Sequence, residues 1–387
     1  MRILALDQFS EPGGAQRCLL DALTAFRSAG WIAHVGLPGN GPIIDQVRAL
    51  GCDVLPIACG PYRSGTKSAG DWLRFGADIP RMALQIRRAV LAFDPDVIYV
   101  NGPRVLPGVA AAATGLPVVF HSHSLVPHGL MRKVSTAALR SVRARVIANC
   151  RFVAEQWSQD FAVDVIYNGV QPPAAPRSVR QGPPVIACIG RIAPEKGQLA
   201  FVQAARRILQ SIPDARFVVW GSAIIADPSY EAEVRRAAAG LPIEFAGWAQ
   251  DVYAALAQTD ILLTPSSAIE ATTRVIPEAW ASGVPVIAFA TGGIAEIVRH
   301  GENGFLVGKT IEMAEYAVRL LTSGSWERET VALQAHRTWE ERFRPERFAR
   351  DLLETLSRAT CADGATSERR SRPAGPLPSH DVPAARP

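Results

Sequence analysis

The sequence predicts an α/β protein of two doubly wound domains, each built on a parallel sheet. Three observations carry this prediction. The chain has 387 residues, which is too long for one ordinary domain of about 100 to 200 residues. Short β-branched runs alternate with helical patterns along most of it, as in βαβ units. The alternation is interrupted once, between residues 171 and 184, by a stretch that contains five prolines.

The first half of the chain, residues 1–170, predicts one Rossmann-like domain. The expected strands are 2–6, 32–37, 53–57, 97–101, 117–121 and 145–148, and the expected helices include 15–29, 43–50 and 79–92. Consecutive parallel strands need a crossover, so covering helices on both faces of one sheet are the simplest arrangement.

The stretch 171–184 is predicted to be a linker, because proline fixes φ and removes the amide donor that a helix or central strand needs. The same alternation then restarts and predicts a second Rossmann-like domain over 185–338. Its expected strands are 185–189, 216–220, 243–246, 261–264 and 284–288, and its expected helices are 198–210, 230–239, 252–258 and 277–281.

The end of the chain has two parts. An amphipathic pattern over 339–359, broken at Pro345, predicts a helix that leaves the second domain. The tail 360–387 is rich in Ala, Pro, Ser and Arg. Such a composition cannot bury a core, so it predicts disorder.

Composition excludes several classes of protein. The six cysteines are dispersed without metal-ligand spacing, which argues against a disulfide scaffold and a zinc module. A charge at Arg2 and another at Asp7 leave no room for the apolar core of an export signal, so we expect a cytoplasmic protein. Residues 1–180 carry 19 basic and 12 acidic side chains. They contain no dense basic run with interleaved aromatic residues, so nucleic-acid binding is not predicted.

The loops that follow the strands are where a doubly wound sheet binds ligands. The first of them contains Gly13 and Gly14. Two glycines allow close backbone approach, and the helix that follows presents free amides to an anion. A plain strand-to-helix turn is the alternative. A dinucleotide fingerprint is excluded, because GxGxxG is absent.

The loop 190–197 begins with Gly190 and holds two cations, Arg191 and Lys196. Lys196 falls at the start of the next helix, where the helix dipole disfavours a cation unless an anion is also present. Arginine with its bidentate fork and lysine as a point charge together suit a diphosphate. A surface pair of Lys196 with Glu195 is the alternative.

The segment 266–287 holds two carboxylates, Glu270 and Glu278. Pro277 is predicted to be the first helical residue, which places Glu278 in the first turn and Glu270 in the loop before it. Both acids can then face one ligand, one on a sugar hydroxyl and the other on a ribose diol. The amides of residues 272–276 are available to phosphate oxygens.

The strand 117–121 leads into His121-Ser122-His123. Two histidines suit a metal, but no third ligand is spaced nearby, so we predict no metal site. We expect His123 to face the cleft as a neutral imidazole or through its carbonyl.

Taken together, these motifs resemble glycosyltransferase family 4 over about residues 1–358. The resemblance rests on Gly13-Gly14-Ala15-Gln16, His123, Asn168-Gly169-Val170, Gly190-Arg191, Glu195-Lys196-Gly197, Gly221, Gly247-Trp248, Glu270 with Glu278, and Gly283-Val-Pro-Val-Ile. It implies the GT-B architecture, in which two Rossmann-like domains face across a cleft and a C-terminal helix crosses back to the first domain.

The resemblance also implies a reaction, the retaining transfer of a sugar from a nucleotide diphosphate sugar with no obligatory metal and no cofactor. Arg191 and Lys196 would take the diphosphate, Glu278 the ribose, and Glu270 and His123 the donor sugar. The donor-binding set it implies is Gly13, Gly14, Gly190, Gly247, Arg274, Val275, Ile276 and Glu278. Two departures affect donor and acceptor choice: Ala271-Thr-Thr-Arg274 replaces the Pro-Phe-Gly-Leu that often follows the first glutamate, and Gln16 stands where an acid is frequent.

The expected partners are a nucleotide-sugar donor and a glycolipid or oligosaccharide acceptor of cell-envelope, polysaccharide or lipopolysaccharide synthesis. A nucleotide-sugar epimerase and a non-catalytic nucleotide-sugar scaffold are the alternatives. Cations at 132, 133, 140, 143 and 145 interleave with apolar residues and predict peripheral contact with an anionic membrane on its cytoplasmic face, the alternative being a surface helix packed on its sheet. Residues 60–75 are predicted to be a mobile acceptor loop.

Overall fold

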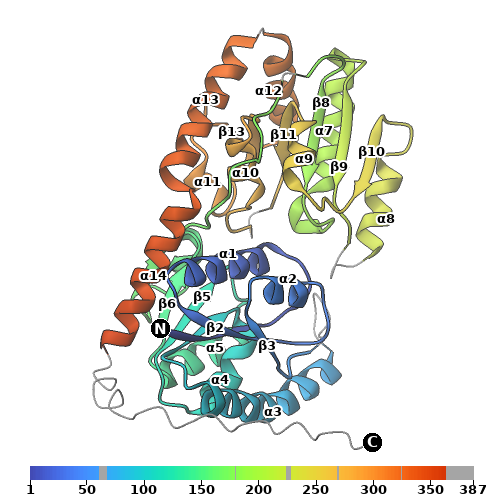
Figure 1. Cartoon of the computed structure of the whole chain (residues 1–387). Helices are drawn as coiled ribbons and strands as arrows, with labels where there is room; N and C mark the ends of the chain where they lie inside the picture. The colour runs from blue at the N-terminus through green and yellow to red at the C-terminus, as the bar shows by residue number, and fades with distance from the viewer. Residues whose placement is uncertain (61–67, 179, 224–227, 268–269, 324, 363–387) are drawn as a thin grey trace, which may run out of the picture.

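The computed structural model describes residues 1–60, 68–178, 180–223, 228–267, 270–323 and 325–362. Figure 1 shows two lobes, each with a central sheet and helices packed around it. Positions 61–67 of the predicted acceptor loop and 363–387 of the predicted tail lie outside the described residues. Contrary to the prediction, positions 69–75 of that loop and 360–362 of that tail are helical.

The N-terminal lobe is built on a seven-stranded parallel sheet with the order β3-β2-β1-β4-β5-β6-β7. Its strands are β1 (Arg2–Asp7), β2 (Ile32–Leu37), β3 (Asp53–Pro56), β4 (Val97–Asn101), β5 (Val118–Ser122), β6 (Arg145–Ala148) and β7 (Val163–Val165). Its helices are α1 (Gly14–Ser28), α2 (Ile43–Ala49), α3 (Ala69–Phe93), α4 (Leu106–Ala112), α5 (Leu130–Ser141) and α6 (Arg151–Glu155), with a short 3-10 turn, η1 (Pro103–Val105). The central strands are buried on both faces, which explains their continuous apolar runs.

The C-terminal lobe is built on a six-stranded parallel sheet with the order β10-β9-β8-β11-β12-β13. Its strands are β8 (Val185–Ile189), β9 (Arg216–Trp220), β10 (Ile243–Gly247), β11 (Ile261–Thr264), β12 (Val286–Phe289) and β13 (Phe305–Val307). Its helices are η2 (Pro194–Lys196), α7 (Gln198–Ser211), α8 (Pro228–Ala237), α9 (Val252–Ala257), α10 (Val275–Ala281), α11 (Ile294–Ile297) and α12 (Thr310–Thr322). The chain is thus an α/β protein of two doubly wound domains, as predicted.

Two consecutive helices end the described chain, α13 (Ser325–Arg342) and α14 (Pro345–Ala362). Figure 1 shows them running along one side of both lobes. The predicted break at Pro345 is present, but the helix before it begins at Ser325 and not at Trp339, because the pattern over 325–338 is too weakly amphipathic to be recognised. α13 packs on α10, whereas α14 packs on α1 and buries Phe348, Leu352 and Leu356 in the N-terminal core. The chain therefore returns to its first domain.

Two helix starts differ from the prediction. α3 begins at Ala69, ten residues before the predicted start, because a capping box of Ser68 and Asp71 nucleates it and Pro80 is tolerated inside it. α10 begins at Val275, so Pro277 is its third residue and not its first. The amides of the first helical turn have no partner within the helix, so proline costs no hydrogen bond there.

The sequence pattern also missed some elements. The edge strands β7 and β13 have three residues each, which is too short for a two-residue alternation to be recognised.

Candidate active site

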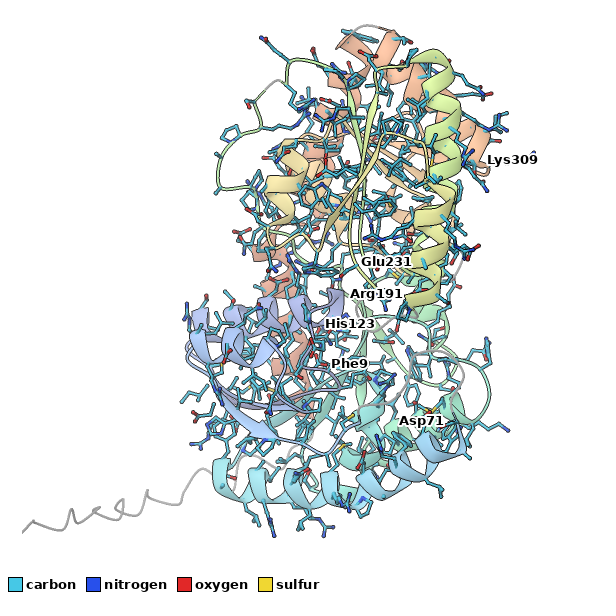
Figure 2. The ribbon with its side chains drawn as sticks, turned by 90° about the vertical axis from the view of Figure 1, so that its right-hand side faces the viewer. Phe9, Asp71, His123, Arg191, Glu231 and Lys309 are labelled. Carbon is cyan, nitrogen blue, oxygen red and sulfur yellow. The ribbon has the colours of Figure 1, made fainter. Side chains whose placement is uncertain are left out.

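A cleft of about 690 Å³ lies between the two domains, where the carboxyl ends of both sheets meet. Figure 2 shows Phe9 and His123 of the N-terminal domain below Arg191 of the C-terminal domain at this junction. The predicted residues that line it are Gly13, Gly14, His123, Gly190, Arg191, Lys196, Glu270, Arg274, Val275 and Glu278. The fold therefore collects most of the predicted site from segments that are far apart in sequence.

Two predicted donor residues are not in this lining. Gly247 ends β10, and its neighbours Trp248 and Ala249 line the cleft instead. Ile276 is fully buried in the core under α10. Because α10 begins two residues earlier than predicted, the Ile276 side chain turns inward with the helix.

The N-terminal wall is fixed by a network of neutral and acidic groups at the ends of β1, β4 and β5. Nε2 of His123 donates to Oδ1 of Asn101 at 2.6 Å, because Nδ2 of Asn101 is turned to Oδ2 of Asp7 at 2.5 Å. Gln16 also donates to Asp7, at 2.9 Å. Burial, assisted by the charge of Arg274, lowers the pKa of His123 to about 3. His123 is therefore neutral, with its proton on Nε2.

The buried carboxyl of Asp7 should make the stability of the protein depend on pH. Burial raises its pKa from 3.8 to about 6, against the opposing hydrogen bonds from Asn101, Phe9 and Gln16. Between these two values the folded chain holds a proton that the unfolded chain has lost, so stability falls as pH rises. We predict that the stability of the wild type relative to Asp7→Asn falls by about 2 kcal/mol between pH 4 and pH 7, measured by urea unfolding. A difference that does not change with pH would contradict this.

The C-terminal wall carries two ion pairs formed by the predicted phosphate ligands. Nη2 of Arg191 lies 2.9 Å from Oε1 of Glu195, and Nζ of Lys196 lies 2.5 Å from Oε2 of Glu270. The alternative pairing of Lys196 with Glu195 is not the one formed. Each cation is held at the cleft by a carboxylate, and Lys196 and Glu270 are both mostly buried.

Gly197 places Lys196 by a close backbone approach. It adopts φ +72°, and a Cβ there would lie 1.9 Å from the carbonyl oxygen of Pro265. We predict that Gly197→Ala lowers the free energy of unfolding by about 1 kcal/mol or more beyond the loss in Gly240→Ala. The additional loss arises because the backbone atoms in contact must move apart. Gly240 is the matched control, since it has φ +78° and open space around its Cβ. Equal unfolding free energies for the two variants would show that the approach is unimportant.

A buried charge cluster joins the two domains across the cleft. Nη1 of Arg274, at the start of α10, lies 2.8 Å from Oδ2 of Asp21 on α1. Nε of Arg274 lies 3.7 Å from Oε1 of Glu278, and that Nε has no hydrogen-bond partner. Burial raises the pKa of Asp21 and of Glu278, and Arg274 opposes the rise in both. Arg274, which the resemblance placed in the donor-binding set, is thus also an interdomain ion-pair partner.

Several polar and aromatic groups of the cleft and its support were not predicted from the sequence. They are Asp7, Asp21, Asn101, Asn149 and Trp220. Asp7, Asn101 and Trp220 end their strands, so the rule that directed attention to the loops also applied to them. Asp21 gave no such signal, because it lies in the middle of a helix.

The basic pattern over 130–145 falls mainly on α5, and much of it is used within the domain. Arg132 lies over the ring of Trp157 at 4.0 Å, Arg140 pairs with Asp160 and Arg145 pairs with Asp164. Leu139 is buried. These contacts fit the alternative of a helix packed on its sheet.

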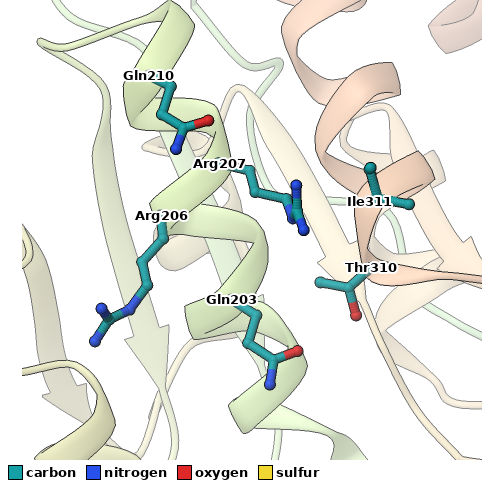
Figure 3. A pocket seen from close by; sticks show the side chains of 6 residues that line it. All are labelled: Gln203, Arg206, Arg207, Gln210, Thr310 and Ile311. Atoms are coloured by element: carbon teal, nitrogen blue, oxygen red, sulfur yellow. The ribbon is translucent and has the colours of Figure 1, made fainter.

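A second hollow, of about 480 Å³, lies in the C-terminal domain between α7 and α12. Figure 3 shows the side chains that line it. Arg206 and Arg207 lie beside it, and no residue predicted to act in chemistry does.

Among the described helices, none combines the length and apolar composition needed to cross a bilayer.

Comparison with known sequences decides the family. Residues 12–172 match the family described as Glycosyltransferase Family 4, and residues 183–323 match Glycosyl transferases group 1. The chain belongs to the family 4 glycosyltransferases. The two matches meet at the linker between the two sheets, so each domain of this glycosyltransferase corresponds to one of them.

Relatives and solved structures agree with this assignment. A phosphatidyl-myo-inositol mannosyltransferase of Mycobacterium tuberculosis is 25% identical over 77% of this chain and 80% of its own. A GDP-mannose-dependent monoacylated alpha-(1-6)-phosphatidylinositol monomannoside mannosyltransferase of Corynebacterium glutamicum is 33% identical over 36% of this chain and only 38% of its own. The structure of Anabaena HepE in complex with UDP and glucose superposes with a TM-score of 0.76 and 26% identity, over 92% of this chain and 99% of that one. The glycosyltransferase therefore has the GT-B fold.

Proposed function

We propose that this glycosyltransferase transfers a hexose from a nucleoside diphosphate sugar to a glycolipid or growing polysaccharide, with retention of the anomeric configuration and no obligatory metal. One observation carries the proposal. Arg191, Lys196, Glu270 and Glu278 of the C-terminal domain converge with His123 of the N-terminal domain on a single cleft.

The leaving diphosphate determines the role of the cations. As the bond from the sugar C1 to the phosphate oxygen breaks, negative charge accumulates on the diphosphate, and preorganised cations stabilise it without reorganisation. Arg191 and Lys196 supply two such charges, and the amides that begin α1 supply partial ones. Protein-borne cations at this position support transfer without an obligatory metal.

The carboxylates position the donor. Glu278 is buried in the first turn of α10, where it suits a ribose diol. Glu270 is held by Lys196 at the cleft and suits hydroxyls of the donor sugar. Retention is supported by the likeness of the Glu270-to-Glu278 segment to the family. The anomeric configuration of the product, read by NMR, tests it.

Part of the N-terminal side of the cleft, which we assign to the acceptor, is apolar. Phe9, Val126, Pro127 and Met131 of the N-terminal domain line it, with Arg104 over the ring of Phe9 at 4.7 Å. Such a wall fits a glycolipid, whose sugar needs polar contacts and whose lipid needs apolar ones. The two mannosyltransferase relatives, which are named for phosphatidylinositol acceptors, support the same class.

Donor binding is tested by thermal unfolding of the wild type and of Glu278→Ala with UDP, GDP, ADP, CMP and their sugars, and with NAD as the control. A ligand at about 100 times its Kd adds about 2.7 kcal/mol to stability. We expect one nucleoside diphosphate to raise the Tm, and Glu278→Ala to weaken that effect. A response to NAD alone, or to none of them, would contradict the proposal. Interconversion of the donor without an acceptor would instead indicate an epimerase.

A further inference from the structure

A cluster of metal-ligating side chains lies behind the N-terminal wall of the cleft. The sequence offered His121 and His123 without a third ligand, and the fold supplies it from α1. Sγ of Cys18 and one ring nitrogen from each histidine all lie within 4.8 Å of one another. The two imidazole rings are 4.0 Å apart between centroids.

Two unpartnered ring nitrogens of this cluster point to a ligand. Nε2 of His121 and Nδ1 of His123 are both buried without a hydrogen-bond partner, which is costly for polar atoms. Because Nε2 of His123 carries the proton donated to Asn101, its Nδ1 presents a lone pair. His121 is fully buried, so its orphaned nitrogen is not satisfied by bulk solvent.

The outer contacts of both rings have the form that metal sites use. A ligating histidine commonly donates its second ring N–H to an oxygen, which fixes its tautomer and orientation. Nε2 of His123 donates to Oδ1 of Asn101, and Nδ1 of His121 lies 2.6 Å from the hydroxyl of Tyr99. Asn101 in turn donates to Asp7, so Asp7 orients Asn101 and Asn101 orients His123.

We propose that Cys18, His121 and His123 form a binding site for a borderline-soft divalent cation of the Zn²⁺ class. One thiolate and two imidazoles are three ligands that Zn²⁺ accepts, with a fourth position left for water. Binding releases the Cys18 proton to solvent, and the thiol gives up its hydrogen bond to Asn168. Bound ligand atoms would be about 3.5 Å apart, so binding draws together atoms that now lie within 4.8 Å of one another. The site goes beyond the transfer reaction proposed above.

Co²⁺ titration of the whole chain tests the site, because cobalt bound to a thiolate gives a near-ultraviolet charge-transfer band. The experiment uses a Cys361→Ser background, since Cys361 is exposed. We expect one equivalent of Co²⁺, displaced by Zn²⁺. The band should disappear in Cys18→Ser, with at least about tenfold weaker binding. It should persist in Cys59→Ser, the matched buried cysteine.

Two further outcomes keep the test decisive. If Cys18→Ser does not fold, His121→Asn takes its place and should weaken binding to the same degree. No saturable band in the background protein, or Co²⁺ binding as tight as in the background protein in both variants, would overturn the proposal. The titration uses no donor or acceptor, so its failure leaves the proposed transfer reaction untouched.

Discussion

Lys196→Ala should lower kcat by about 10²- to 10³-fold, the loss found when one preorganised group is removed from a developing negative charge. Lys196 is mostly buried at the cleft and is fixed by Glu270. It therefore costs little reorganisation when charge develops on the diphosphate. If the contact is made mainly in the transition state, kcat should fall much more than KM changes. Steady-state kinetics with the donor identified by thermal unfolding provide the measurement.

Lys309→Ala is the matched control for this substitution. Lys309 is exposed on the outer side of the C-terminal domain, far from Arg191 in Figure 2. Its removal should leave kcat within about twofold of the wild type, since surface changes away from such features have small effects. A loss of less than tenfold in Lys196→Ala, with an unchanged Tm, would refute the assigned role.

Arg274→Met should be the most destabilising of the charge substitutions, by about 3 to 5 kcal/mol. It leaves two carboxylates, the buried Glu278 and the partly buried Asp21, without the cation between them. The cost of an uncompensated buried charge exceeds the value of the pair itself. Urea unfolding gives the free-energy difference, with Arg48→Met as the control. Arg48 pairs with Asp45 at the surface, with both side chains mostly exposed, and such pairs contribute about 1 kcal/mol or less.

The double variant distinguishes a charge effect from a packing effect. Asp21→Asn added to Arg274→Met removes one of the two orphaned carboxylates, so it should restore part of the lost stability. If the double variant is no more stable than Arg274→Met alone, the uncompensated charge of Asp21 is not the cause of the loss. An Arg274→Met loss equal to that of Arg48→Met would contradict the prediction altogether.

Local sequence patterns predicted much of this fold because its interior strands are continuous apolar runs and its linker is rich in proline. The positions after strands also located Arg191, Lys196, Glu270 and His123, since parallel strands bring their carboxyl ends to one edge. The short edge strands β7 and β13 gave no such pattern, because three residues cannot show a period.

The contacts that could not be predicted are those between distant helices and loops. Asp21 and Arg274 are separated by 253 positions, and neither pattern nor propensity relates them. The same applies to Cys18, which joins His121 and His123 only because α1 packs over the sheet beside β4. A sequence pattern locates the end of a strand, but it does not show which helix face packs against that end.

The return of the chain to its first domain has a consequence for engineering. α14 buries Phe348, Leu352 and Leu356 in the N-terminal core, although it is encoded after the whole C-terminal domain. A hybrid enzyme that takes only the segment before the linker from a relative would place the relative's N-terminal core against α14 of this chain. The side chains of α14 would then not match the core on which they pack. The natural unit of exchange is discontinuous, and consists of the residues of β1 to β7 together with those of α14.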